Sequence, residues 1–364
     1  DRFVLSMIEE NDLKPAPPAD KATLLRRAYF DLTGLPPGIE QIEAFLADDS
    51  PDAYAKVVDD LLASPRFGER WGRHWLDVAR YADTTGGGRN NPFPNAPYYR
   101  EYVIESYNED KPFDQFAKEQ IAGDLLHSST DEEYNENLTG TGFLALGPHN
   151  YELQDKALLR MEIVDEQLSA VGRAFLGVTM GCARCHDHPV DPMTTEEYYQ
   201  LTATFWDQVK EAPQASKKRI AIEITEPREL RKGSWSSPGA KVSPGFLKVL
   251  SRKEDSHWRG PARNELAALG NWLTDTEHGG GELLARVIVN RLWHYHFGQG
   301  LVMTPNDFGN QGTPPTHPHL LDYLAHRLIQ AGWKLKPIHQ LILTSAVYRQ
   351  AGTTNIDPLK VDAE

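Results

Sequence analysis

The chain has 364 residues, 40% hydrophobic and 25% charged, which is the composition of an ordinary globular protein with room for two domains. Its 52 acidic and 38 basic side chains give a formal net charge of −14, which argues against nucleic acid or an anionic membrane as the main partner. No apolar run approaches the ~18 residues that a membrane span needs, so we predict no membrane-spanning segment.

The N-terminal part of the chain, up to about residue 63, predicts three amphipathic helices. Asp20 is placed to cap the first helix, which ends at Gly34. The second helix covers 39–46, and the third begins at Ser50 with a proline directly after it. The apolar positions of these helices are predicted to be core.

The segment 67–83 is rich in aromatic, basic and acidic side chains. On one helix His74, Asp77 and Tyr81 would share a face, and Arg80 would extend a ladder of charged side chains. One interpretation is a packed helix with a satisfied histidine and structural ion pairs. The other places His74 or Arg80 against a bound cofactor. The glycine-rich stretch that follows is predicted to be a surface loop.

Further helices are predicted at 98–107, 113–126 and 153–176. Beyond them, Thr194 and Glu197 form a capping box that opens another helix with several aromatic residues. This helix can supply an apolar wall for a cofactor, and it is equally consistent with ordinary core.

The segment Gly181–His188 contains the only two cysteines of the chain. Cys182 and Cys185 are three positions apart and His186 follows directly, so they form Cys-x-x-Cys-His, the attachment motif of c-type haem. In this motif the two thiols form thioethers with the porphyrin and the histidine is the proximal iron ligand. We therefore predict one covalently bound haem c, with His186 as the proximal ligand.

Two alternatives to haem remain for this motif. A redox-active dithiol is expected after a βαβ pattern, and none precedes Cys182. A zinc site could use Cys182, Cys185 and His188, but structural zinc takes four ligands and no second Cys/His pair has the right spacing. The alternative function is accordingly a haem-free zinc or calcium protein with hydrolytic or structural work in the cell envelope.

The sixth iron position has several candidate ligands. We favour His74 as the distal ligand, because its helix also offers Arg80 and other arginines to the haem propionates. His188 is counted among the cofactor-binding residues, although it is too close to His186 in sequence to reach the opposite haem face. We expect it beside Asp187 or Asp191, which would hydrogen-bond its imidazole. The other candidates are His149, His296, Met180, Met193 or no protein ligand.

The pattern changes after residue 216. Ile220–Ile224 alternates like a short strand, and 233–244 is rich in glycine, serine and proline, which predicts a connection with a small hairpin. A second helical block follows, with helices at 262–273, 282–297, 319–330 and 338–348. We predict a mainly α protein with two helical domains, and we divide the chain into residues 1–215, 216–256 and 257–364.

The second helical block has its own polar cluster, formed by His294, His296, Asn306 and Asp307. An electron carrier does not need a domain of this size. The cluster suggests a pocket at the domain boundary, where ligand sites often lie. The sequence leaves open whether the protein is an enzyme with a substrate in that pocket or a carrier whose second domain docks to a partner.

Several motifs spread over most of the chain carry a family resemblance. They resemble a two-domain family of planctomycete-type secreted proteins, in which a cytochrome c-like domain precedes a domain of unknown function. The resemblance implies export and haem binding at Cys182, Cys185 and His186, and it implies no particular reaction. The family's connecting region is usually longer than the stretch 209–249 here. The motifs are Tyr29–Pro37, Glu69–Asp83, Gln120–Asp124, Cys182–Pro192, Asn290–Trp293, Phe297–Val302, Asn306–Gly309 and Ser345–Arg349.

Together these observations predict an exported c-type haem protein with a redox role. It would act in electron transfer or as a haem-dependent oxidoreductase, with a redox protein or a small molecule as partner. We expect a periplasmic or extracellular location, with a signal peptide already removed. A third possibility is an envelope binding protein in which the haem or a metal is structural.

Overall fold

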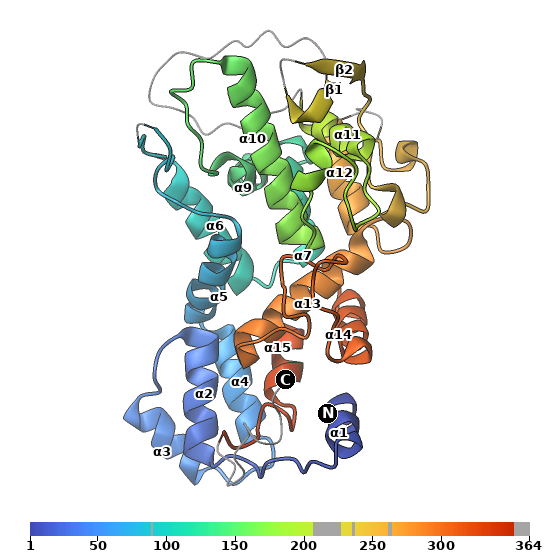
Figure 1. Ribbon diagram of the computed structural model, residues 1–364. Helices are drawn as coiled ribbons and strands as arrows, with labels where there is room; N and C mark the ends of the chain where they lie inside the picture. The colour runs from blue at the N-terminus through green and yellow to red at the C-terminus, as the bar shows by residue number, and fades with distance from the viewer. Residues whose placement is uncertain (89, 207–226, 235–236, 261–263, 353–364) are drawn as a thin grey trace.

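The computed structural model describes residues 1–88, 90–206, 227–234, 237–260 and 264–352. Over these residues the chain is mainly α-helical, with a short two-stranded sheet, as predicted (Figure 1). None of the helices in these ranges has the length and apolar character required to cross a membrane.

The N-terminal helices follow the sequence signals closely. Helix α2 begins after Asp20, whose Oδ1 accepts the backbone N–H of Thr23 at 2.8 Å, and it ends at Gly34, where φ is +72°. The third predicted helix begins later than expected, because Asp52 is its N-cap. An additional helix at the start of the chain was not predicted. The helices are α1 (Arg2–Glu10), α2 (Lys21–Thr33), α3 (Ile39–Ala47) and α4 (Ala53–Ala63).

Helix α5 (Pro65–Val78) is shorter than the predicted segment 67–83. The chain turns at Arg80, which has a φ of +57°, so Arg80 and Tyr81 lie outside the helix. The predicted face of His74, Asp77 and Tyr81 and the full charge ladder are therefore wrong. What remains of the ladder is the ion pair between Arg73 and Asp77, with Nη1 and Oδ1 2.7 Å apart.

The middle of the chain forms a set of helices that leads into the cysteine motif. Helix α11 begins with the predicted capping box: Thr194 Oγ1 accepts the N–H of Glu197 at 3.1 Å, and Glu197 Oε2 accepts the N–H of Thr194 at 2.9 Å. The elements are α6 (Ala96–Asn108), α7 (Phe113–Ala122), η1 (Gly123–Leu125), α8 (Asp131–Gly140), α9 (Gly142–Ala145), α10 (Lys156–Val171), the π-turn η2 (Gly172–Leu176), the 3₁₀ turn η3 (Gly181–Arg184) and α11 (Thr195–Trp206).

The connection contains the predicted small hairpin. Strands β1 (Arg228–Leu230) and β2 (Pro238–Lys241) pair antiparallel, with the turn η4 (Arg231–Gly233) after the first. The predicted strand Ile220–Ile224 lies outside the described residues. Two further 3₁₀ turns lead to the last helices: η5 (Lys248–Leu250), η6 (Asp255–His257), α12 (Glu265–Thr274), α13 (Gly281–Phe297), α14 (Pro318–Gln330) and α15 (Lys336–Leu343).

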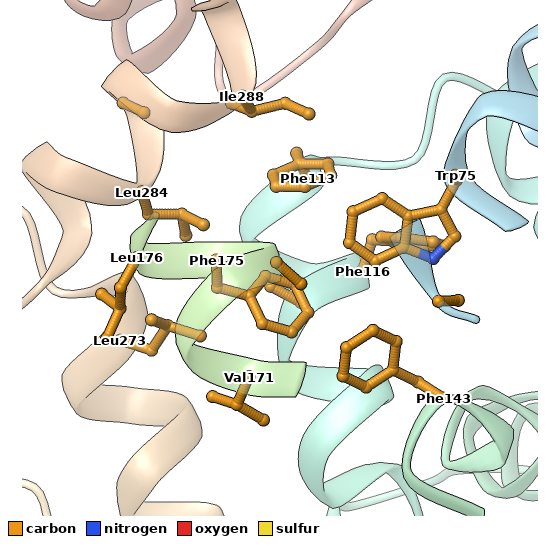
Figure 2. Packing of buried hydrophobic residues seen from close by; sticks show 14 of the residues in the cluster. Trp75, Phe113, Phe116, Phe143, Val171, Phe175, Leu176, Leu273, Leu284 and Ile288 are labelled. Atoms are coloured by element: carbon orange, nitrogen blue, oxygen red, sulfur yellow. The ribbon is translucent and has the colours of Figure 1, made fainter. Parts of the chain in front are cut away.

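One hydrophobic core runs through both helical blocks. It includes buried residues from Leu24 in α2 to Tyr348 after α15. Figure 2 shows its centre, where aromatic rings of the first block lie beside leucine and isoleucine side chains of α12 and α13. The ring centroids of Trp75 and Phe175 are 5.5 Å apart there. Removing such rings from water is the main driving force for this packing.

Hydrogen bonds also join the two blocks. The buried Arg291 in α13 donates to the backbone carbonyls of Ala174 and Arg173, the second at 2.7 Å. Asp110 after α6 accepts the backbone N–H of Leu335 at 2.8 Å. The blocks therefore share both core and polar contacts. The predicted boundaries near residues 215 and 257 stay predictions.

Candidate functional site

The cysteine motif lies on a short 3₁₀ turn that presents both thiols to solvent. Cys182 and Cys185 are exposed and free. Ala183 between them is fully buried, and its N–H donates to the carbonyl of Met180 at 3.0 Å. The apolar side of the turn is thus anchored in the core, which leaves the two sulfur atoms available for reaction.

The neighbours of the turn hold it in place. Tyr199 in α11 donates its hydroxyl to the carbonyl of Arg184 at 2.8 Å, and the Arg184 guanidinium lies 3.4 Å from the carboxylate of Asp165 in α10. A Cβ atom at Gly233 would lie 2.6 Å from the sulfur of Cys185, so the η4 turn passes directly beside this thiol. Helices α10 and α11 and the hairpin together fix the position of the motif.

The ring of His186 has the orientation that a metal ligand needs. Its Nδ1 lies 2.7 Å from the carbonyl oxygen of Asp187. A carbonyl only accepts, so Nδ1 carries the proton and Nε2 keeps its lone pair. The side chain is exposed, and His186 follows Cys185 directly in the chain. A backbone carbonyl that holds one imidazole nitrogen while the other binds metal is a common arrangement in metal sites. Two free thiols and this imidazole fit the attachment of haem.

His188 differs from His186 in its burial and in its hydrogen bonding. Its side chain is fully buried, and its Nδ1 accepts the backbone N–H of Asp191 at 2.9 Å. The carboxylate of Asp191 lies 3.5 Å from the same nitrogen, so an aspartate lies beside this histidine as expected, but Nδ1 accepts from the Asp191 backbone and does not donate to the carboxylate. Among the described residues, Nε2 of His188 has no hydrogen-bond partner. The zinc alternative would need this buried ring to reach the exposed thiols.

The C-terminal block touches the loop that follows the motif. Asn310 donates its backbone N–H to Asp191 and its side-chain amide to the carbonyl of Val190, both at 2.7 Å. Phe308 donates its N–H to the carbonyl of Gly177 at 2.6 Å, just before the motif. The turn 306–310 therefore contacts the chain on both sides of the cysteines.

His74, the predicted distal ligand, lies against the C-terminal block. Its ring stacks on Tyr295 of α13 with centroids 3.8 Å apart, and it also contacts Trp71. Burial lowers the pKa of His74 to about 4, with further lowering by Arg70 and His296. The described contacts of His74 are with these residues and not with the segment 182–188. Its role as an iron ligand stays a prediction.

Arg80, the predicted propionate partner, forms a half-buried ion pair with Glu166 of α10. The Nε and Oε1 atoms are 2.6 Å apart. Burial raises the pKa of Glu166, and the neighbouring Arg80 partly offsets this effect. This pair connects the turn after α5 to the helix that precedes the motif. Binding of a propionate by Arg80 is not tested by these contacts.

The other candidate distal ligands are also buried. Burial lowers the pKa of His149 to about 4, and its ring packs against the ring of Tyr151. His296 contacts His339 through Nε2 and Nδ1, which are 2.9 Å apart. Met180 and Met193 are almost completely buried. Each side chain is held within the protein interior.

Two protein-family models match most of the chain. A family model described as PSCyt2, a protein of unknown function (DUF1549), matches residues 1–210. The chain belongs to the PSCyt2 family. A second model, described as PSD1, also a protein of unknown function (DUF1553), matches residues 263–364. No curated protein and no solved structure matches the chain.

A pocket of about 390 Å³ lies between the PSCyt2 and PSD1 segments. The PSCyt2 side contributes Arg173 from η2, the segment that leads into the cysteine motif, and the PSD1 side contributes the buried Arg291. The charged and polar residues around it are Asp77, Arg80, Arg173, Arg291, His294, Tyr295 and Asn306. Arg80 is already paired with Glu166, and the remaining Arg173 and Arg291 against Asp77 favour a ligand with negative charge.

The predicted polar cluster of the second block divides between this pocket and other positions. His294 and Asn306 line the pocket. His296 turns into the core, and Asp307 instead accepts the N–H of Gly309 at 3.0 Å and so stabilises a turn. Arg291 was missed by sequence reasoning, although an arginine inside an apolar helix is the signal that could have found it.

Proposed function

We propose that this PSCyt2 protein is an exported c-type haem protein with a redox role. Cys182 and Cys185 would hold the porphyrin through thioethers, and His186 would ligate the iron through Nε2. The observation that carries the proposal is the hydrogen bond from Nδ1 of His186 to the carbonyl of Asp187, beside two exposed free thiols. Haem supplies one-electron chemistry through its iron. Export follows because thioethers of this kind are formed outside the cytoplasm.

The residues of the chain have distinct tasks in this proposal. The buried Ala183 and the Tyr199–Arg184 hydrogen bond keep the two thiols at a fixed separation. The Asp187 carbonyl fixes the tautomer and the orientation of His186. The contacts of Asn310 with Asp191 and Val190 hold the following loop, so the C-terminal block supports the haem region directly.

The pocket between the two blocks is the proposed place for an oxidoreductase substrate. It lies along the η2 segment that leads into the motif, and its arginines favour an anionic small molecule. The alternative is a carrier that only passes electrons to a partner protein. Both versions place the haem at the same site, but only the oxidoreductase needs the pocket.

The first experiment tests the haem. The chain is exported to the periplasm of a host that carries the c-type haem maturation machinery, then purified and extracted with acidified organic solvent. We expect the colour to stay with the polypeptide and the pyridine haemochrome spectrum to indicate two thioethers. Cys182→Ala should leave one thioether at most, and His186→Ala should lose the low-spin spectrum. His326→Ala, at an exposed position on α14, is the matched control.

A colourless but folded protein, or haem that is extracted completely, would overturn the proposal. Metal analysis of a colourless protein would then test the zinc alternative at the same cysteines.

The second experiment separates enzyme from carrier. Arg173→Ala removes an exposed pocket cation and should leave the haem spectrum unchanged. An enzyme with an anionic substrate should lose turnover at least about tenfold, which corresponds to one charge-assisted hydrogen bond. If the protein is only an electron carrier, the haem of the Arg173→Ala variant should be reduced and oxidised as fast as that of the unchanged protein. Turnover of candidate electron donors and of peroxide is assayed for the unchanged protein and for the Arg173→Ala variant.

A further inference from the structure

A second group of potential metal ligands lies away from the cysteine motif. His257 at the end of η6, Asp275 after α12 and His278 in the following turn bring one ligand atom each to within 4.8 Å of one another. Nε2 of His257 lies 3.7 Å from Oδ2 of Asp275, and Nδ1 of His278 lies 3.9 Å from the same oxygen. The two imidazole rings are 5.3 Å apart. Both rings thus face one carboxylate oxygen.

The carboxylate between the rings is held in place before any ion binds. Oδ1 of Asp275 accepts the backbone N–H groups of Glu277 and His278, both at 2.9 Å. Oδ2 accepts the indole N–H of Trp258 at 2.9 Å. These three hydrogen bonds fix the carboxylate in one orientation, with Oδ2 towards the two imidazole rings.

The turn that carries His278 is tight and has an outer carboxylate. A Cβ atom at Gly279 would lie 2.2 Å from the carbonyl oxygen of Trp272, so the turn packs directly on the end of α12. Nε2 of His278 lies 3.6 Å from Oε1 of Glu277, on the side of the ring away from Asp275. A carboxylate behind a ligating histidine orients the ring and raises its basicity as a ligand.

An ordinary explanation covers only part of this arrangement. Asp275 ends α12 and caps the next turn, and Oδ1 alone satisfies both backbone N–H groups. The cap gives no reason for two histidines from separate segments to face Oδ2. The convergence of His257 from η6 and His278 from the turn after α12 is what a metal site requires.

We propose that His257, Asp275 and His278 bind a divalent first-row transition ion such as zinc. Two imidazoles and one carboxylate suit zinc and related ions, whereas calcium and magnesium prefer oxygen ligands alone. Tetrahedral ligands at zinc are roughly 3.3 Å apart, so small side-chain rotations close the present distances. Three protein ligands leave a position for water or a substrate group, as in reactive zinc sites.

The side chains of His257, Asp275 and His278 are all partly exposed, so an ion can reach them from solvent. The backbone of Gly279 and the Arg252 side chain border a pocket of about 560 Å³, and the N–H of Arg252 donates to the carbonyl of His278 at 2.8 Å. The same pocket is lined by Phe308 and Asn310, which contact the chain around the cysteine motif. An ion here would also tie η6 to the PSD1 segment. The inference does not depend on haem binding.

The test is a zinc titration of the full chain. The protein is treated with a chelator, and any free thiols are alkylated so that Cys182 and Cys185 cannot contribute. Zn²⁺ is then added in a calorimeter, and Co²⁺ is added to a second sample for its visible absorption spectrum. We expect one ion per chain, quenching of tryptophan fluorescence by Co²⁺ because Trp258 adjoins the site, and a Co²⁺ spectrum with nitrogen and oxygen ligands.

Variants at the two histidine ligands, at Glu277 and at one control position decide the outcome. His257→Ala and His278→Ala should each weaken binding more than about tenfold, because even outer-shell partners contribute 10–100-fold. Glu277→Gln should weaken it by less than the ligand variants, and His326→Ala should leave it unchanged. His257 is exposed, so its variant keeps the fold, which circular dichroism checks.

Absence of stoichiometric Zn²⁺ binding by the unchanged chain would overturn the proposal. Binding that persists at full strength in both histidine variants would overturn it as well.

Discussion

Two histidine-bearing regions of this protein are built in opposite ways. At the cysteine motif, His186 is exposed and holds its ring through one hydrogen bond to a backbone carbonyl. Between α13 and α15, His296 and His339 are buried against each other, with a nitrogen–nitrogen distance of 2.9 Å. The carboxylate of Asp31 lies 3.7 Å from the other nitrogen of His296. The first region keeps its side chains available, and the second uses them for packing.

The difference shows that residue type alone does not indicate a reactive site. Burial lowers the pKa of His339 well below its ordinary value, with His296 and His74 adding to the effect, so the ring is neutral and inaccessible. His296 also has a lowered pKa from burial, which Asp31 only partly offsets. The three histidines whose rings contact Trp71 lie where the two blocks meet: His74, His296 and His339. The exposed turn instead keeps Cys182, Cys185 and His186 accessible to solvent.

The largest expected effect comes from the buried pair. His339→Ala leaves a cavity beside Trp71 and removes the partner of His296. We expect the free energy of unfolding to fall by about 3 kcal/mol, within the range for large-to-small core substitutions. Urea unfolding followed by circular dichroism measures it, with His326→Ala as the control. A loss below about 1 kcal/mol would mean that the pair is not part of the core.

A somewhat smaller effect is expected at Arg291, which joins the blocks without a carboxylate partner among the described contacts. Arg291→Met removes hydrogen bonds to the carbonyls of Ala174 and Arg173 and to the Asn306 amide oxygen. Part of this loss of stability is offset, because the methionine variant no longer has to bury a cation. We expect destabilisation of about 2 kcal/mol. Arg291→Lys should not restore stability, because an ammonium cannot reproduce the guanidinium geometry. Full rescue by lysine would contradict this account.

The pH dependence of stability sharpens the comparison further. The pKa of His74 falls from 6.5 to about 4 on folding, so below about pH 6.5 the unfolded chain binds a proton that the folded chain does not. The contribution of His74 to the free energy of unfolding is fully present above pH 6.5 and is lost as the pH falls towards 4. His74→Phe keeps a ring against Tyr295 and should reduce the slope of unfolding free energy by at most about 1.4 kcal/mol per pH unit. Urea titrations at several pH values between 7 and 4 measure the slope. An unchanged slope would show that His74 is already protonated in the fold.

The smallest expected effect is at His186. In the haem-free chain, His186→Ala removes an exposed side chain and should change the free energy of unfolding by no more than about 0.5 kcal/mol. The same substitution should abolish the low-spin spectrum of the haem-loaded protein. Urea unfolding of the haem-free chain and an absorption spectrum of the loaded chain provide the two readouts. Destabilisation comparable to that of His339→Ala would place His186 among the structural histidines.

Local sequence determined the helices and the cysteine motif. Asp20 and Gly34 bound α2, and Thr194 and Glu197 open α11, because capping depends on groups within a few residues of one another. The Cys182–His186 motif could be recognised for the same reason, since its three chemical groups are neighbours in the chain. The hairpin and the mainly α class followed from composition and periodicity.

The tertiary structure alone decided which side chains meet. The end of α5 at Val78, the pairing of Arg80 with Glu166 and the stacking of His74 on Tyr295 join residues distant in sequence. The approach of His257 to Asp275 is of the same kind. Helical periodicity predicts which face of a helix is buried, but it does not predict which residues that face packs against. Those long-range contacts arise from packing of the whole core. For that reason the two thiols and His186 could be grouped from the sequence, and only the fold separated the exposed imidazoles from the buried ones.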